Sequence, residues 1–111
     1  MPDSAPTARI VLTTTGTAEE AERLARTLVE ERLAACATLI PGALSIYRWQ
    51  GEVESAGETM LLIKTSAELL ANLESRLHEL HSYQAPEFLV LPVESGSSTY
   101  LNWLKANLRD V

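Results

Sequence analysis

The 111-residue sequence has little of several residue types whose abundance would define a class of protein. Its one cysteine, Cys36, excludes a disulfide scaffold, and a hydrophobic content of 46% excludes a disordered chain. The longest apolar runs, such as residues 33–37, are far too short to span a membrane. The N-terminus lacks the basic region and apolar core of a signal peptide. Together with the single unpaired thiol, this predicts a cytoplasmic protein.

Basic residues are also few, because nine Lys and Arg against fifteen Asp and Glu leave a formal net charge of −6 at pH 7. They are scattered, without a basic stripe or interleaved aromatic residues, so no nucleic-acid partner is expected. The sequence contains no glycine-rich phosphate loop, Gly-x-Ser-x-Gly elbow or aspartate-based triad. It therefore predicts a protein that is not an enzyme and has no organic cofactor.

The length suits one compact domain. Residues 1–8 are polar, contain two prolines and lack an apolar period, so we expect a flexible N-terminal tail before a single domain of residues 9–111. The β-branched run 9–15 predicts a buried strand. Thr17 then resembles a helix N-cap, and Glu20 three residues later would complete a capping box.

The helix that follows Thr17 has an amphipathic period and is expected to end near Arg32. Residues 35–48 predict a long second strand with a bulge or bend at Pro41–Gly42. Two turn signals, Gln50–Gly51 and Ala56–Gly57, are expected to bound a hairpin whose return strand is residues 59–65.

Ser66 can cap a second helix. One stripe of leucines marks the apolar face of that helix: Leu69, Leu70, Leu73, Leu77 and Leu80. A fourth strand is expected at residues 87–93, and a short third helix after Gly96.

The resulting order, β-α-β-β-α-β with an added C-terminal helix, predicts an α+β ferredoxin-like sandwich with both main helices on one face of the sheet. Residues 61–63 and 88–91 are apolar at consecutive positions, so they place apolar side chains on both faces. A face without helices must then be covered, and a second copy of the chain is the simplest cover. The sequence therefore predicts an oligomer.

Three residues are candidate metal ligands. Cys36 could be a soft thiolate ligand or reactive thiol, or simply a small buried hydrophobe. His78 and His81 are three residues apart, so their rings could share a helix face and chelate a transition metal. A histidine near a helix C-terminus is equally explained by the helix dipole.

Five further residues form a looser candidate set for a ligand cleft: Tyr47, Trp49, Lys64, Tyr83 and Glu87. Such a set would suit an anionic or planar ligand, and packing explains it about as well. Trp49, beside a turn, also suits an anchor at a subunit boundary.

Five ordered segments carry a resemblance: ERLAACA (31–37), IPGALSIYRWQG (40–51), IKT (63–65), HSYQAPE (81–87) and YLNWL (100–104). They resemble the CutA family of divalent-cation tolerance proteins, over about residues 9–108. The resemblance implies a ferredoxin-like subunit in an intertwined homotrimer, similar in assembly to the PII signalling proteins. It also implies a link to tolerance of copper and other divalent metals, with no established reaction.

The resemblance also bears on the metal ligands. His81 matches the histidine of the family's His-Pro-Tyr, although Ser82 replaces the proline. Some copper-binding members have a cysteine and a second histidine where this chain has Thr13 and Leu80, so His78 would be a local replacement.

We therefore expect a homotrimeric protein that binds copper or another divalent ion through His81, His78 and Cys36, with no nucleic-acid or membrane partner. The alternative is a PII-like trimeric sensor that binds a small ligand in the cleft between subunits.

Overall fold

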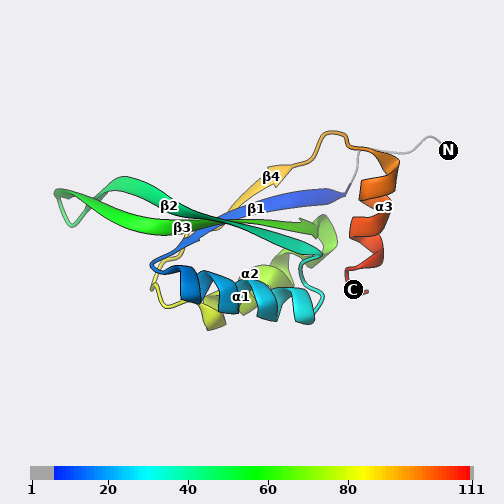
Figure 1. Cartoon of the computed structure of the whole chain (residues 1–111), viewed down its shortest axis with the longest axis horizontal. Helices are drawn as coiled ribbons and strands as arrows, with labels where there is room; N and C mark the ends of the chain where they lie inside the picture. Colours follow the sequence, from blue (N-terminus) through cyan, green and yellow to red (C-terminus); the bar gives the residue numbers. More distant parts are fainter. Residues whose placement is uncertain (1–6, 111) are drawn as a thin grey trace.

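A computed structural model describes residues 7–110 and contains four strands and three α-helices (Figure 1). The elements follow in this order: β1 (Ala8–Thr15), α1 (Ala18–Glu30), β2 (Cys36–Trp49), β3 (Glu52–Ser66), the short 3₁₀ helix η1 (Ala67–Leu69), α2 (Leu70–Leu80), β4 (Leu89–Pro92) and α3 (Ser98–Ala106). Residues 1–6 of the expected tail lie outside the described residues. Within residues 7–110, no helix is long and apolar enough to cross a membrane.

The four strands form one antiparallel sheet in the order β2-β3-β1-β4. Both α1 and α2 lie against the same face of this sheet, as expected, and α3 packs near the start of β1 (Figure 1). The α+β class and the predicted order of elements are confirmed. β4 is shorter than predicted, because its pairing with β1 extends only from Arg9 to Leu12.

Side chains along β3 alternate between the two faces of the sheet. Leu61 and Ile63 are fully buried beneath the helices, where they join the core with Leu28, Leu73 and Leu77. The buried leucines of α1 and α2 recur at helical spacing, so each helix places one apolar stripe on the sheet. This layer forms the main hydrophobic core.

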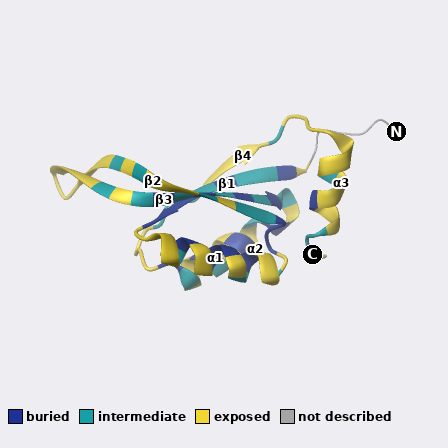
Figure 2. Ribbon diagram, in the orientation of Figure 1, coloured by how far each residue is buried: buried dark blue, intermediate teal, exposed yellow. Residues whose placement is uncertain are grey.

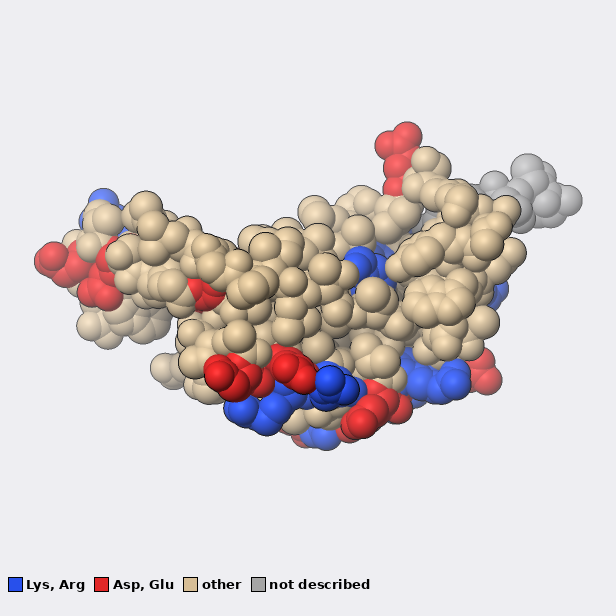
Figure 3. All heavy atoms as spheres, viewed as in Figure 1, with Lys and Arg blue, Asp and Glu red and all other residues tan. Residues whose placement is uncertain are grey.

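The opposite face of the sheet carries neither α1 nor α2 (Figure 2), and a helix reaches it only at one end, where Leu104 of α3 packs with Ala8. The strand register places apolar side chains from all four strands on this open face: Ile10, Leu12, Ile40, Met60, Leu62, Leu89 and Leu91. Charged residues instead gather over the helix layer, and the surface above the strands is mostly uncharged (Figure 3). The apolar strands are thus two-sided, and coverage of the open face by another copy stays a prediction.

The β2–β3 hairpin extends well beyond the rest of the sheet (Figure 1). Pairing between β1 and β3 stops at Thr59, whereas β2 and β3 stay paired as far as Trp49 and Glu52. We call the projecting part, residues 43–58, the arm. Its two-residue turn has positive φ at both Gln50 and Gly51, which matches the twist of a hairpin.

Two expectations for this hairpin have different outcomes. The predicted irregularity at Pro41–Gly42 is confirmed, because the register shifts between Ile40 and Ala43. The predicted turn at Ala56–Gly57 is wrong, and these residues lie within β3 opposite Ser45 and Leu44. Continuous pairing with β2 overrides the local turn preference. β3 is therefore about twice as long as the predicted return strand, residues 59–65.

The predicted helix caps are only partly correct. Thr17 is the N-cap of α1, and its hydroxyl accepts a hydrogen bond from the Glu20 amide at 3.1 Å. The Glu20 carboxylate does not complete the predicted box, because it accepts hydrogen bonds from Ser82 instead. Ser66 precedes η1 without a side-chain cap, and α1 ends at Glu30, two residues before Arg32, whose φ is +60°.

Two buried threonines on neighbouring strands allow a matched test of this core. The Thr13 hydroxyl on β1 is buried and has no hydrogen-bond partner within the described chain, whereas Thr65 on β3 donates to the Leu33 carbonyl at 2.7 Å. An unpaired buried hydroxyl costs about 1–3 kcal/mol, so Thr13→Val should raise the free energy of unfolding by about 1 kcal/mol. Thr65→Val should lower it. Urea unfolding at one protein concentration measures both, and a loss of stability in Thr13→Val would contradict this account.

Candidate functional site

The three predicted metal ligands lie in different environments. His78 is exposed in the last turn of α2. His81 follows the end of that helix, and its side chain is completely buried. Cys36 is half-buried at the start of β2. Because α2 ends at Leu80 and His81 has extended backbone angles, the two histidines do not occupy one helix face.

The strand register separates Cys36 from His81. Cys36 pairs with Lys64, which in turn pairs with Ile10 on β1, whereas His81 contacts Thr14. Four residues along a strand correspond to about 13 Å. In residues 7–110, no group of three or more His, Cys, Asp or Glu side chains is arranged to hold a metal ion.

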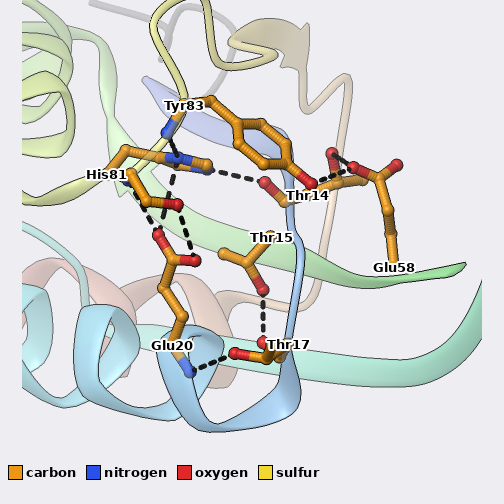
Figure 4. A network of polar contacts seen from close by, with 8 residues as sticks. Thr14, Thr15, Thr17, Glu20, Glu58, His81 and Tyr83 are labelled. Carbon is orange, nitrogen blue, oxygen red and sulfur yellow. Dashed lines mark hydrogen bonds and ion pairs between the residues drawn. The ribbon is translucent and has the colours of Figure 1, made fainter. Parts of the chain in front are cut away.

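Both ring nitrogens of His81 are hydrogen-bonded within the subunit (Figure 4). Nδ1 accepts a hydrogen bond from the Tyr83 amide at 3.0 Å, so this nitrogen carries no proton. Nε2 therefore holds the proton of the neutral ring and donates it to the Thr14 carbonyl at 2.7 Å. β4 pairs with β1 only as far as Leu12, and the imidazole supplies a hydrogen bond two residues beyond that point.

Glu20 of α1 fixes the next residue of the same loop. One carboxylate oxygen accepts a hydrogen bond from the Ser82 amide at 2.8 Å, and the other accepts one from the Ser82 hydroxyl at 2.9 Å. A proline at position 82 would have no amide hydrogen to donate. Glu20 also lies 3.7 Å from Nδ1 of His81.

Tyr83 connects this loop to β3. Its hydroxyl donates to Glu58 at 2.9 Å, and the Thr14 hydroxyl donates to the same carboxylate oxygen at 3.2 Å. The Tyr83 hydroxyl would lie 3.3 Å from a Cβ on Gly16, so a glycine at the end of β1 leaves room for the phenol. The rings of Tyr83 and His81 are 4.8 Å apart.

We call this set of six residues the corner cluster: Thr14, Glu20, Glu58, His81, Ser82 and Tyr83. Figure 4 labels all of them except Ser82. It joins β1, α1 and β3 to the loop after α2. Burial raises the pKa of Tyr83 to about 12, helped by the hydrogen bond to Glu58 and by the negative charges of Glu58 and Glu20. The cluster therefore favours the neutral phenol as the donor to Glu58.

The five predicted cleft residues are spread along the subunit. Lys64 donates to the Thr38 hydroxyl at 2.6 Å and lies 3.7 Å from the Cys36 sulfur. Trp49 lies opposite Glu52 at the tip of the arm, twelve residues along β3 from Lys64, or about 40 Å in an extended strand. Tyr83 belongs to the corner cluster, and its phenol is close enough to Tyr47 for the two groups to interact electrostatically.

No single cleft of the subunit therefore contains these five residues together. Glu87 is half-buried in the loop before β4. A surface groove of about 310 Å³ lies between α1 and β2, and it is lined by other residues, including Val29 and Leu39.

Sequence reasoning missed most of the corner cluster. The sequence predicts Thr14 only as part of a strand and Glu20 only as part of a helix cap, and it predicts no role for Glu58. Glu20 and Ser82 are 62 residues apart, and neither has a distinctive local pattern. The one available signal was the position of His81 and Tyr83 immediately after the leucine stripe of α2, where a helix end must be fixed.

The chain is similar to known proteins over nearly its whole length. A family profile described as CutA1 divalent ion tolerance protein matches residues 9–107. A Thermus thermophilus protein named divalent-cation tolerance protein CutA is 47% identical over 98 residues, which cover 88% of this chain and 95% of that protein.

Two solved structures have closely similar folds. CutA1 from Oryza sativa has a TM-score of 0.94 at 36% identity, covering 98% of this chain and all of that one. The protein from Archaeoglobus fulgidus, named periplasmic divalent cation tolerance protein CutA, has a TM-score of 0.89 at 32% identity, covering 92% and 99% of the two chains.

The Tyr83 phenol provides a direct test of the corner cluster. Its pKa should be about 12, against about 10 for an ordinary tyrosine. The folded state then holds this proton more tightly than the unfolded chain. The protonated Tyr83 phenol therefore stabilises the folded state below about pH 10, and this stabilisation is lost as the pH rises through about 12.

NMR titration of labelled tyrosine rings measures this pKa. Glu58→Gln removes a carboxylate but leaves the burial, so the Tyr83 pKa should fall only part of the way towards 10. A Tyr83 pKa near 10 in the unsubstituted protein would contradict the geometry described.

Proposed function

The chain belongs to the CutA1 divalent ion tolerance family, and we propose that it serves divalent-cation tolerance by binding copper or another divalent metal ion, without catalysing a reaction. The observation that carries this proposal is the family match over residues 9–107. The acidic chain, with a formal net charge of −6, attracts cations in general. We place the protein in the cytoplasm because its one cysteine is unpaired, although the Archaeoglobus relative is named periplasmic.

The exposed ring of His78 is the best available ligand for such an ion in this subunit. Copper leads the divalent series at nitrogen sites, and His78 offers an imidazole to solvent. The predicted partners His81 and Cys36 are less accessible, because the His81 nitrogens are hydrogen-bonded and the Cys36 sulfur lies beside the Lys64 ammonium. One imidazole makes a weak site, so binding by an isolated subunit should be modest.

We further propose that the chain is a ferredoxin-like subunit of a homotrimer. The strand order β2-β3-β1-β4 and the two helices on one face support the ferredoxin-like topology. The open face supports assembly, because a contiguous apolar surface of this kind is costly to leave in water. The arm supports it too, since Leu44, Ile46 and Val53 are between 65% and 69% exposed.

The alternative of a PII-like sensor receives no support from the names of the relatives described above. We therefore do not propose a small-molecule ligand.

Copper titration tests the cation-binding proposal. Calorimetry should show that His78→Ala weakens copper binding by about tenfold or more, the scale expected when a ligand or its support is lost. Because imidazole must be neutral to bind a metal, affinity should fall on acidification at a higher pH than binding by carboxylates alone would. Equal copper uptake by the wild type and His78→Ala would contradict the assignment of His78 as a ligand.

Dissociation of the assembly tests the proposed trimer. Trp49 on the arm is 52% exposed, so Trp49→Ala should weaken assembly by about 2 kcal/mol, as loss of an aromatic anchor does. Val29→Ala, at an exposed position on α1, is the matched control and should leave assembly unchanged. Sedimentation over a dilution series measures both, and identical profiles for the two variants would count against a role of the arm.

A further inference from the structure

We propose that His81 is a positioning residue that fixes the base of the arm through Tyr83 and Glu58, and that it is not a ligand for divalent metal ions. The first support is the use of its ring nitrogens. A metal needs a free lone pair on one nitrogen, but Nδ1 accepts the Tyr83 amide and Nε2 donates to the Thr14 carbonyl. Binding a metal at either atom would break one of these hydrogen bonds.

The surroundings of the ring give the second support. The His81 side chain is completely buried, and its neighbours are the Thr14 carbonyl on β1, the Tyr83 ring and the Glu20 carboxylate on α1. Both Glu20 oxygens already accept hydrogen bonds from Ser82. Within residues 7–110, neither these side chains nor any others form a group of three or more His, Cys, Asp or Glu residues that could hold a metal ion. The groups around His81 therefore suit a neutral imidazole held in one orientation by hydrogen bonds rather than a copper site.

The third support is where the hydrogen bonds lead. Nδ1 fixes the backbone of Tyr83, whose hydroxyl then reaches Glu58 on β3. Glu58 pairs with Ala43, the first pair after the irregularity at Pro41–Gly42. This is where the arm leaves the four-stranded part of the sheet. The buried ring is thus linked by two hydrogen bonds to the base of the arm.

The state of the wild-type ring provides the first test. ¹⁵N NMR of the two histidine rings during titration with Zn²⁺, a diamagnetic ion, reports each ring separately. His81 should show the Nε2–H tautomer both before and after saturation with zinc. A zinc-dependent shift of the His81 ring nitrogens would overturn the proposal. The response of His78 concerns the proposed cation binding alone, so the two ideas fail independently.

Backbone amide exchange provides the second test, with variants that each keep one half of the ring's bonding. His81→Asn keeps an acceptor near the position of Nδ1, and His81→Gln keeps a donor near the position of Nε2. Exchange at the Tyr83 amide should become about tenfold faster in His81→Gln and change much less in His81→Asn, because a lost hydrogen bond permits local opening.

The same variants test the link to the arm. Exchange at Ala43 and Leu44 should accelerate in His81→Gln and in Tyr83→Phe, and combining the two should add little. His78→Gln, the matched control on α2, should change none of these amides. Equal protection of Ala43 in His81→Gln and the wild type would overturn the link between His81 and the arm.

Discussion

Side chains along β3 alternate between a face covered by α1 and α2 and a face that these two helices leave open, and the core, the open face and the arm follow from that alternation. Leu61 and Ile63 complete the core with α1 and α2, while Met60 and Leu62 on the same strand lie on the open face. β3 also pairs with β1 on one side and β2 on the other. β3 continues past the end of its pairing with β1, and this extra length forms one strand of the arm. One strand therefore contributes to the core, the open face and the arm.

The corner cluster lies where these features meet. It takes the carbonyl and hydroxyl of Thr14 near the end of β1, the Glu20 carboxylate of α1 and the Glu58 carboxylate at the base of the arm. Without these hydrogen bonds, little would fix the conformation of the loop after α2. A buried neutral imidazole is well suited to this task, since it supplies one donor and one acceptor at fixed geometry.

The sequence predicted the element order, the bulge and the two-sided strands, because each depends on local patterns of apolar, proline and glycine residues. It failed where distant contacts override local preference. Ala56–Gly57 has the composition of a turn, yet pairing with β2 carries β3 through it. The spacing of His78 and His81 suggested a chelating pair only if α2 continued, but the helix ends at Leu80. The hydrogen bonds between Glu20 and Ser82 join residues that no sequence pattern connects.

The apolar open face and the exposed arm are the reasons for our proposal that this subunit is incomplete without further copies of the chain. Native mass spectrometry of the purified wild-type protein tests this proposal, since the same spectrum reports the number of subunits and any retained metal ion. We expect a species of three subunits at micromolar concentration, without a stable folded monomer. A folded monomer as the main species at that concentration would contradict it.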